Sequence, residues 1–438
     1  MSAGQLPVVV VGGGIAGVSC CAELRAQGYA GPITLIDAGD LLHDRPPLSK
    51  ELLRGEVDES GIRLHDEAWF AASDIALHQG ISVDRVVGSA PDDLAVVLAD
   101  GRTMPAAAVV LATGGLARRL PVVGGYLAEL HHLRTVDDAR RLRQALVPGR
   151  RVCVVGGGLI GAEIASTASD LGAQVVLVEP TLPLEPVVGR DVARWLHDLH
   201  VAHGVRVVEA AVVEIRTAAT TSTRDGSTRG GSTPGGSTSP RLEVVTSDGQ
   251  VLAVDDVVVG VGGIPDTRVA EASGLEVVPG SGVVVDGAGR TTRAGVYAIG
   301  DVALHEHPRL GRTRSEHWDA ATRSAARAAA AIATGDGPES ERAHEHETPW
   351  FWTDRYGHHV EVTGDAVHGD RVVRGVVGEP PFAVLRLVGG ALTGAVTVDL
   401  GPTGRAVRRL VEAGASVDAD VLGDPATDLR VLARRLPR

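Results

Sequence analysis

Apolar residues occur in short runs that end in glycine, and two such segments are nearly alike. Residues 7–37 read PVVVVGGGIAGVSCCAELRAQGYAGPITLID, in which an apolar strand, a glycine turn, a helix and a second strand follow one another. Residues 151–179 repeat this order as RVCVVGGGLIGAEIASTASDLGAQVVLVE. Continuous apolar strands that alternate with helices are typical of a buried parallel sheet. The pattern therefore predicts an α/β fold with two Rossmann-like dinucleotide-binding domains.

Later apolar runs indicate how the two domains are joined. VVLATGG at 109–115 and VVVGVGG at 257–263 each end in small residues, one in either half. Residues 282–301 predict two more strands, and a helix follows at about 316–333. Short alternating strands then lead to a helix at 402–414 and a last short helix, which predicts a separate α+β domain. The predicted division is a first domain over 1–118 and 265–335, a second domain inserted over 119–264, and a C-terminal domain over 336–438.

Residues 217–240 form a low-complexity segment, TAATTSTRDGSTRGGSTPGGSTSP. Ser, Thr, Gly and Pro bury too little apolar surface to order a chain, so this segment is expected to be disordered. It lies between the strand-like runs VVEIR and RLEVVTSDG. We interpret it as an enlarged hairpin loop of the second domain.

Glycines at a fixed spacing mark both turns as dinucleotide sites. Gly12 permits a tight turn, Gly14 lets the backbone approach a pyrophosphate, and Gly17 lets the helix pack on the strand. The helix N-terminus then faces the phosphates with its partial positive charge. Asp37 closes the second strand, where a carboxylate accepts ribose hydroxyls. The second half repeats the set as Gly156, Gly158, Gly161 and Glu179. Two such motifs in register disfavour the alternative, a pair of glycine turns without a ligand.

The acid of the second motif indicates which nicotinamide coenzyme binds. A carboxylate at Glu179 binds a ribose 2′-hydroxyl and repels a 2′-phosphate, and Pro180 and Thr181 supply no arginine for that phosphate. NADH is therefore favoured over NADPH. The alternative is that Glu179 is only a solvated strand end.

Composition excludes several classes of protein. The chain has 438 residues and a net charge of −13, which argues against a nucleic-acid partner. Cys20, Cys21 and Cys153 form no Cys-x-x-Cys pair, so we expect neither a disulfide redox centre nor a metal site. The start, MSAGQLPVVVVGGG, has no charged segment before an apolar signal core, and its apolar run is too short to span a bilayer. We expect a cytoplasmic protein with no membrane partner.

Six motifs together resemble one family over nearly the whole chain. They are DRPPLSKELL, LATGG, GGGLIGAE, AIGDVA, SEHW and PWFWTD, and they occur in the family's order. The chain resembles the FAD-dependent NADH–ferredoxin reductases of oxygenase systems, to which the apoptosis-inducing-factor-like flavoproteins are related. The resemblance implies a glutathione-reductase-like pair of dinucleotide domains. Because the return strand ends in Gly300 and Asp301, which can reach the flavin ribityl and phosphates, FAD is expected in the first site and NADH in the second.

The resemblance also implies roles for individual residues. Lys50 is expected beside the flavin near N5, with Arg45 and the prolines shaping its loop, and a cation there stabilises the charge of an arriving hydride. Glu163, in the first turn of the second helix, is expected to pair with Lys50 across the domain interface. Trp318 is expected to face the flavin ring; its alternative is a core aromatic at a domain junction. The further cofactor positions assigned by motif or resemblance are Ile15, Ala16, Ile81, Ala112, Thr113, Gly114, Arg118, His317, Leu159, Ile160 and Gly262.

The implied reaction is transfer of a hydride from NADH to FAD, followed by single-electron delivery to a 2Fe–2S ferredoxin. That ferredoxin would serve a cytochrome P450 or a Rieske oxygenase. Two alternatives stay open: a flavin-dependent tailoring oxidoreductase or monooxygenase that acts on a small organic substrate, and a redox sensor that changes its oligomeric state. The protein is expected to be a monomer or a homodimer.

Several segments depart from the family pattern or carry other candidate chemistry. Pro186 stands where the family has an arginine that helps hold NADH, and Arg355, Tyr356 and Gly357 replace Gln-Tyr-Asp. AHEHE at 343–347 has metal-ligand residues but is expected to be a solvated loop. His197, His200 and His203 fall at helical spacing, as a metal site or as a surface helix. Arg309, Arg312 and Arg314 form either a ferredoxin-binding patch or ordinary solvated arginines.

Overall fold

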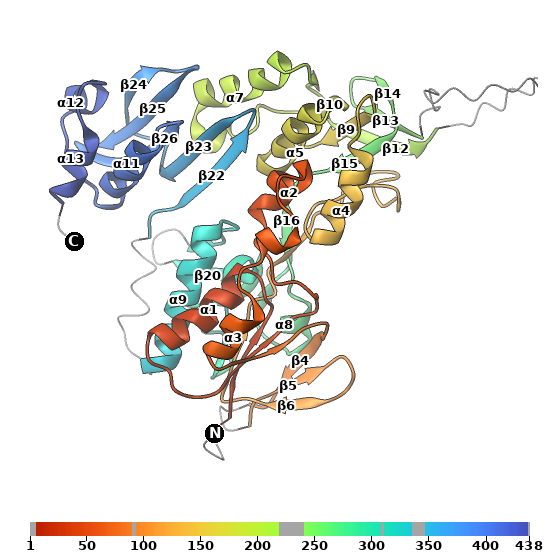
Figure 1. The fold of residues 1–438 in the computed structure, drawn as a ribbon, viewed down its shortest axis with the longest axis vertical. Coiled ribbons are helices and arrows are strands. Elements are labelled where there is room, and N and C mark those ends of the chain that lie inside the picture. The colour runs from red at the N-terminus through yellow and green to blue at the C-terminus, as the bar shows by residue number, and fades with distance from the viewer. Residues whose placement is uncertain (1–5, 90–92, 219–240, 308–310, 335–346, 437–438) are drawn as a thin grey trace, which may run out of the picture.

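Three layered regions make up the molecule in Figure 1. The computed structural model describes residues 6–89, 93–218, 241–307, 311–334 and 347–436. A parallel sheet near the N-terminus occupies the lower part of the view, and the second parallel sheet and the C-terminal antiparallel sheet lie above it. The α/β fold class predicted from the sequence is confirmed.

The first sheet has five parallel strands, in the order β19–β7–β1–β2–β3. Its last strand in sequence, β19, joins it beside β7 after the chain has passed through the second sheet, as the sequence predicted. The bounds are β1 Val8–Val11, β2 Ile33–Ile36, β3 Ile75–His78, β7 Ala108–Leu111 and β19 Val296–Ala298.

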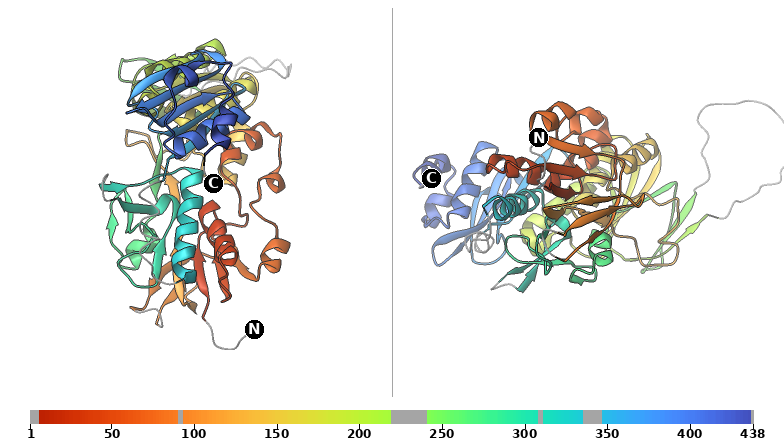
Figure 2. Two further views of the ribbon diagram at one scale, coloured as in Figure 1. Left: turned by 90° about the vertical axis from the view of Figure 1, so that its left-hand side faces the viewer. Right: turned by 90° about the horizontal axis from the view of Figure 1, so that it is seen from below.

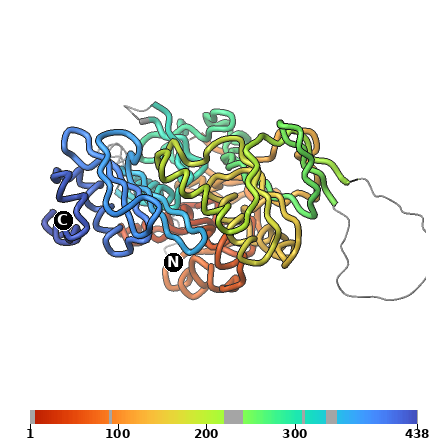
Figure 3. The backbone as a smooth tube through the Cα atoms, turned by 90° about the horizontal axis from the view of Figure 1, so that it is seen from above, coloured from red at the N-terminus to blue at the C-terminus, as the bar shows by residue number. Residues whose placement is uncertain are grey.

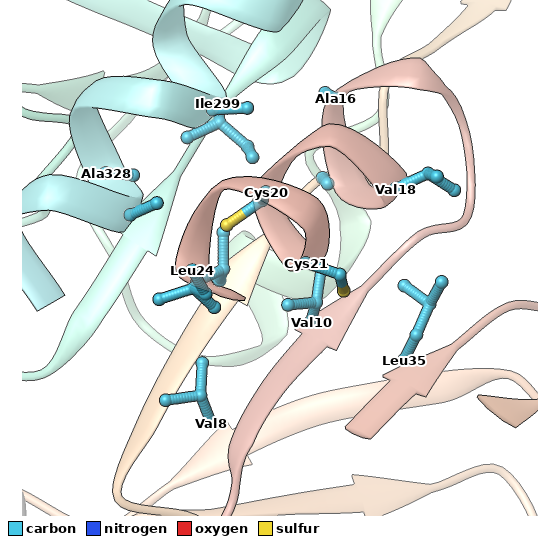
Figure 4. Packing of buried hydrophobic residues seen from close by; sticks show 14 of the residues in the cluster. Val8, Val10, Ala16, Val18, Cys20, Cys21, Leu24, Leu35, Ile299 and Ala328 are labelled. Atoms are coloured by element: carbon cyan, nitrogen blue, oxygen red, sulfur yellow. The ribbon is translucent and has the colours of Figure 1, made fainter. Parts of the chain in front are cut away.

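Two helices cover one face of this sheet. They are α1 (Ile15–Ala26) and α9 (Trp318–Thr334), which lie side by side in Figure 2, left. Figure 4 shows Cys20 and Cys21 of α1 packed among apolar side chains of the sheet and of α9. Both thiols are free and buried, and burial raises the pKa of Cys20 to about 12. They pack as core residues.

Shorter elements complete the first region. An antiparallel sheet of β4, β5 and β6 packs on the opposite face of the parallel sheet. The loop from β2 carries a 3-10 turn, Pro46–Ser49, and then α2, which leads toward the second region. The remaining bounds are α2 Glu51–Arg54, α3 Glu67–Ala72, β4 Val83–Val87, β5 Ala95–Leu98, β6 Thr103–Pro105, α8 Arg268–Ala272, β17 Val277–Val278, β18 Gly282–Val285, β20 Ala303–His307 and β21 Gly311–Thr313.

The second parallel sheet has the order β11–β10–β9–β15. Its apolar strands bury against α5, and α4 lies nearby with a Thr135 capping box at its start. The bounds are α4 Val136–Ala145, β9 Arg151–Val155, α5 Leu159–Asp170, β10 Gln174–Val178, α6 Glu185–Val188, α7 Arg190–Ala202, β11 Arg206–Val208 and β15 Asp256–Val259.

The predicted hairpin of the second region is present. β12 (Val212–Thr217) pairs antiparallel with β13 (Leu242–Thr246), and Thr217 stands opposite Leu242. β14 (Val251–Val254) adds a third strand. Within the predicted disordered loop 217–240, residues 219–240 lie outside the described residues.

Two short strands join the first region to the second. β8 (Gly115–Ala117) directly follows LATG, and it pairs antiparallel with β16 (Gly263–Pro265), which follows GVG. The small residues that end both apolar runs therefore meet at the crossing between the two halves.

The C-terminal region is a five-stranded antiparallel sheet in the order β22–β23–β26–β25–β24. One face of this sheet packs on α11, α12 and α13, and the other face packs on α6 and α7 of the second region. Figure 3 shows the C-terminal region beside the second region. Two short helices follow α11, where the sequence predicted one. The bounds are β22 Trp350–Arg355, β23 His358–Gly364, β24 Asp370–Val376, β25 Glu379–Val388, β26 Ala391–Val398, α11 Pro402–Glu412, α12 Ala419–Gly423 and α13 Leu429–Arg434.

Membrane-spanning segments were sought among the helices of the described residues. None of these helices is both long enough and apolar enough to cross a bilayer.

Candidate functional site

A cavity of about 370 Å³ lies where the three regions meet. Ile15 enters it from the start of α1, and Leu159 and Ile160 enter it from the start of α5. Both helix N-termini therefore open toward one space. Further residues that line this cavity are Asp44, Arg45, Pro46, Lys50, Arg134, Gly158, Glu163, Gly262, Asp301, His317, Trp318 and Trp352.

The first glycine loop is built for close backbone contact. Gly12 has φ +109°, and a Cβ there would stand 2.3 Å from the carbonyl oxygen of Ala112. A Cβ on Gly17 would stand 1.9 Å from the Gly12 carbonyl oxygen, so only glycine allows α1 to meet the strand. A Cβ on Gly14 would meet only the guanidinium of Arg45, at 3.6 Å. The loop thus offers backbone amides and a helix N-terminus to an anion, which fits a dinucleotide pyrophosphate.

The second glycine loop repeats this construction. Gly156 has φ +100°, and a Cβ on Gly161 would stand 2.0 Å from the Gly156 carbonyl oxygen. A Cβ on Gly158 would meet no atom within 4 Å, so the backbone there faces open space in the cavity. This loop also fits a dinucleotide.

The acids at the strand ends anchor these loops. Asp37 Oδ2 accepts a hydrogen bond from the Gly13 amide at 2.5 Å. Glu179 Oε2 accepts one from the Gly157 amide at 2.9 Å, and its Oε1 accepts one from the Thr181 amide at 3.1 Å. Glu179 is therefore tied to the glycine loop at the end of its strand, and its contact with a ribose stays a prediction.

Two arginines and one carboxylate meet at the end of the cavity near α9. Arg134 donates to Asp301 Oδ2 at 2.6 Å, and Arg45 lies 3.7 Å from the same oxygen. Arg45 also lies near Asp37 and Asp44, so its charge is shared among several carboxylates. The guanidinium N–H groups of Arg45 and Arg134 are donors of the kind that bind phosphate groups. Sequence reasoning missed Arg134 because it directly precedes the Thr135 cap of α4, where the pattern indicates only the start of a helix.

The opposite end of the cavity holds the predicted pair of Lys50 and Glu163. Lys50 Nζ lies 3.6 Å from Glu163 Oε1, and both side chains are almost fully buried. Ser49 donates to Glu163 Oε2 at 2.5 Å, and Thr353 donates to Oε1 at 2.8 Å. Three groups from the first and C-terminal regions thus fix the position of this carboxylate of the second region.

Lys50 has a closer partner that sequence reasoning missed. Its Nζ donates to Asp354 Oδ2 at 2.7 Å. Burial alone would lower the pKa of Lys50, but the carboxylates of Glu163 and Asp354 outweigh it and raise that pKa above its usual value. Burial alone would raise the pKa of Asp354, whereas His359 and Lys50 lower it. Lys50 is therefore held as a cation at the inner end of the cavity.

Aromatic side chains form the wall between these ends. Trp318, at the start of α9, donates its indole N–H to Asp44 Oδ1 at 3.1 Å and lies edge-on to Trp352 at 6.5 Å. The Lys50 ammonium stands 5.6 Å above the Trp352 ring. His317 stacks on Phe351 at 4.4 Å. Trp318 thus lines the cavity and also packs at a junction of regions, and its contact with a flavin ring stays a prediction.

The other predicted cofactor positions lie beyond the cavity lining. The Ile81 amide N–H donates to the Asp37 carbonyl at 3.0 Å, and the Gly300 amide N–H donates to the Ser324 hydroxyl oxygen at 3.0 Å. Thr113 donates to the Asp266 carbonyl at 2.7 Å, and the exposed Arg118 donates to the Gly263 carbonyl at 3.1 Å. The contacts of Thr113 and Arg118 lie beside the crossing of β8 and β16. Ala16 lies in the first turn of α1, and Ala112 and Gly114 follow β7 on either side of Thr113.

The histidines of α7 are not surface residues, with one exception. His197 and His200 are buried, and His200 Nδ1 lies 2.6 Å from the Tyr356 hydroxyl. Burial and the nearby Arg355 guanidinium lower the pKa of His200 to about 3, so it is neutral. Only His203 is exposed, and it stacks on Tyr356 at 4.1 Å. The surface-helix prediction is wrong for the first two because α7 packs against the C-terminal sheet.

Other candidate features are ordinary ion pairs where the structure describes them. Arg312 pairs with Glu276 at 2.9 Å, and Arg314 pairs with Glu316 at 2.6 Å, so neither offers an uncompensated charge to a partner. Arg309 and residues 343–346 of AHEHE lie outside the described residues, and Glu347 pairs with Arg327. Among the described residues, no group of three or more His, Cys, Asp or Glu side chains is placed to hold a metal ion.

Comparison with known proteins gives two family matches. Residues 6–325 match the pyridine nucleotide-disulphide oxidoreductase family, and residues 350–433 match the reductase C-terminal family. The ferredoxin–NAD(+) reductase component of the anthranilate 1,2-dioxygenase system of Burkholderia cepacia is 37% identical over 97% of this chain and 98% of the relative. Putidaredoxin reductase of Pseudomonas putida is 33% identical over 97% of this chain and 96% of the relative.

Solved structures agree with these matches. The reductase in the covalent putidaredoxin reductase–putidaredoxin complex superposes with a TM-score of 0.82 at 30% identity, over 98% of this chain and 99% of that chain. The ferredoxin reductase for the CYP199A2 system of Rhodopseudomonas palustris gives 0.82 at 32% identity, with the same coverage.

Proposed function

Because this chain belongs to the pyridine nucleotide-disulphide oxidoreductase family, whose ferredoxin-reducing members use FAD and NADH, we propose that it is an FAD-dependent ferredoxin–NAD(+) reductase. It takes a hydride from NADH and passes the electrons singly to a 2Fe–2S ferredoxin, which serves a cytochrome P450 or a Rieske oxygenase. The relatives named above span the whole chain and serve such systems.

One observation carries the proposal beyond the family name. The cavity between the two glycine loops includes no cysteine among its described lining residues, and Cys20, Cys21 and Cys153 are buried and free. A protein disulfide is therefore not the electron acceptor. An acceptor outside the chain is required, and an iron–sulfur protein accepts electrons one at a time.

The residues around the cavity suit two different dinucleotides. The first loop, with Asp37, Arg45, Arg134 and Asp301, would hold FAD, which supplies a group that takes up a hydride and releases electrons singly. The second loop would hold NADH through Gly156, Gly158, Gly161 and Glu179, beside the exposed Ile160. The accompanying division into domains at residues 118, 264 and 335 is part of this proposal.

The side chains at the inner end of the cavity stabilise negative charge and exclude water. The Lys50 ammonium offers a positive field where a hydride brings negative charge, and it is fixed there by Glu163 and Asp354. Trp318 and Trp352 cover this end with apolar surface, which keeps water away and strengthens that field. Lys50, Glu163 and Trp318 are the catalytic residues of this proposal.

The proposal is tested by anaerobic reduction of the purified protein with NADH, followed by a ferredoxin and cytochrome c. We expect cytochrome reduction that depends on the ferredoxin. Failure of every ferredoxin tried, with rapid reoxidation by oxygen and a small organic substrate, would instead support a monooxygenase.

Location and assembly belong to the same proposal. The free thiols of the described cysteines suit a reducing compartment, and we infer that the protein is cytoplasmic. It acts as a monomer or a homodimer.

A further inference from the structure

A row of ion pairs leads from the inner end of the cavity to the protein surface. Lys50 Nζ contacts Asp354 Oδ2 at 2.7 Å, and Asp354 Oδ1 contacts His359 Nδ1 at 2.5 Å. His359 Nε2 lies 3.5 Å from Glu361 Oε1. The Lys50 side chain is 5% exposed and the His359 side chain is 45% exposed. The row therefore connects a buried cation of the candidate site with a half-exposed imidazole on β23.

We propose that His359 is a positioning residue for the hydride-transfer end of the cavity. Its imidazolium holds the Asp354 carboxylate in the orientation that reaches Lys50, and it supplies the positive charge that balances this second carboxylate. The inference rests on the proposed function, because it takes Lys50 to stand at the group that receives the hydride.

The balance of charges around Lys50 explains why a further cation at His359 is needed. Lys50 is one ammonium between two carboxylates, Glu163 and Asp354. Two further charged groups lie nearby. Arg355, which is fully buried near Glu163, adds a positive charge, and Glu361, at the outer end of the row, adds a negative charge. With His359 charged, three cations and three anions alternate. Arg408 lies near Glu361 but is paired with Asp319 and Glu412 at 2.9 Å each. Without the His359 charge, this row therefore has one anion in excess beside a cavity into which each hydride brings further negative charge.

The groups that face His359 all favour its charged form. Asp354 faces it from β22, Glu361 faces it from its own strand, and Asp399, in the turn after β26, accepts its backbone N–H at 2.7 Å. Hydrogen bonds to Asp354 and Glu361 outweigh burial and raise the pKa of His359 to about 10. A raised pKa means that the cation is present below about pH 10 and is lost above it, so His359 is charged throughout the physiological range.

The test measures the reduction potential of FAD in the holoenzyme by equilibration with a redox dye, in wild type and three variants. His359→Gln removes the charge, and we expect the equilibrium with the dye to shift about tenfold toward the oxidised protein, which is about 30 mV for a two-electron couple. His359→Lys restores a cation and should return most of the shift. His358→Gln is the matched control. His358 lies on the same strand as His359, but it pairs with Asp399 at 2.7 Å and does not contact the row.

A fourth variant gives a shift of the opposite sign. Asp354→Asn removes an anion beside Lys50, so the equilibrium should move toward the reduced protein, and this result decides the matter if His359→Gln does not fold. Equal potentials in wild type and His359→Gln, an equal shift in His358→Gln, or no shift in Asp354→Asn would overturn the inference. A protein that binds no FAD would instead overturn the proposed function. If the protein binds FAD but does not reduce ferredoxin, the proposed acceptor is wrong, and the measured potentials still test the role of His359.

Discussion

The two glycine loops are close structural copies, yet the molecule surrounds them differently. Each leads into a helix of 12 residues and is tied by an acid at the end of the next strand. The first loop is enclosed by the returning segment with Asp301, by α9, and by Arg45 and Arg134. At the second loop, Gly158 faces open space and Ile160 is 46% exposed. This difference supports the proposed assignment, in which the loop that the chain returns over retains its cofactor and the more open loop exchanges its own.

The largest expected effect comes from adding one methyl group to either loop. A Cβ on Gly17 or Gly161 would stand 1.9 or 2.0 Å from a carbonyl oxygen, so the helix must shift by about 1 Å or more. Displacements of that size cost on the order of a hundredfold in function. We expect Gly17→Ala to lose FAD, and Gly161→Ala to keep FAD while the rate of its reduction at low NADH falls about a hundredfold. Flavin content and rapid mixing measure both.

The comparison of the two loops fails if both variants lose FAD to the same extent. It also fails if Gly161→Ala is reduced by NADH as fast as wild type.

The next effect in size concerns the cation between the loops. Lys50→Met removes a buried positive charge from the inner end of the cavity, and losing one such preorganised group slows a reaction by about 100- to 1,000-fold. The rate of flavin reduction at saturating NADH should fall accordingly, with FAD still bound. Arg54→Gln is the control, because Arg54 pairs with Asp170 on the neighbouring helix at 3.4 Å and lies outside the cavity lining. An unchanged rate in Lys50→Met would contradict its assigned role.

A smaller effect distinguishes the two acids. Glu179→Gln removes the charge that repels a 2′-phosphate, so the ratio of kcat/KM for NADH to that for NADPH should fall about tenfold, or about 1.4 kcal/mol. Asp37→Asn should weaken FAD binding and leave this ratio unchanged. A changed ratio in the Asp37 variant would mean that the two loops are not assigned to separate dinucleotides.

The smallest expected effect is the response to pH. The pKa of Lys50 is raised above 10.5, so its cation is present at neutral pH and is lost only above that value. The pKa of Asp354 is lowered below 3.8, so its anion is lost only as the pH falls below that. The rate of flavin reduction at saturating NADH should therefore be nearly flat from about pH 5 to pH 9. A sigmoidal change near neutrality would show that another group controls this step.

The sequence predicted the parts of the site that local patterns encode. The spacing of Gly12, Gly14 and Gly17 and of the matching glycines predicted both loops, because each requirement of the turn is met within a few residues. The family motif around Lys50 and Glu163 predicted their pairing, which the structure contains.

Contacts between distant segments could not be predicted in this way. Asp354 lies 304 residues from Lys50 along the chain, and only the packing of β22 against α5 brings it there. Arg134 lies 167 residues from Asp301. His197 and His200 are polar residues at the spacing of a surface helix, but both are buried, His200 against Tyr356 of the C-terminal region and His197 near Glu209 of the second. Tertiary packing decides which polar side chains are covered by a distant segment of the chain. The local sequence around those side chains carries no signal of it.

We propose that the two similar glycine loops bind two different dinucleotides, FAD and NADH, around one cavity for electron transfer. An anaerobic titration of the purified protein with NADH tests it most directly, with the visible flavin absorption and the NAD⁺ released recorded together. We expect one bound FAD per chain that is fully bleached by a single equivalent of NADH, with NAD⁺ formed in equal amount. A purified protein with no flavin, or a bound flavin that NADH does not bleach, would contradict it.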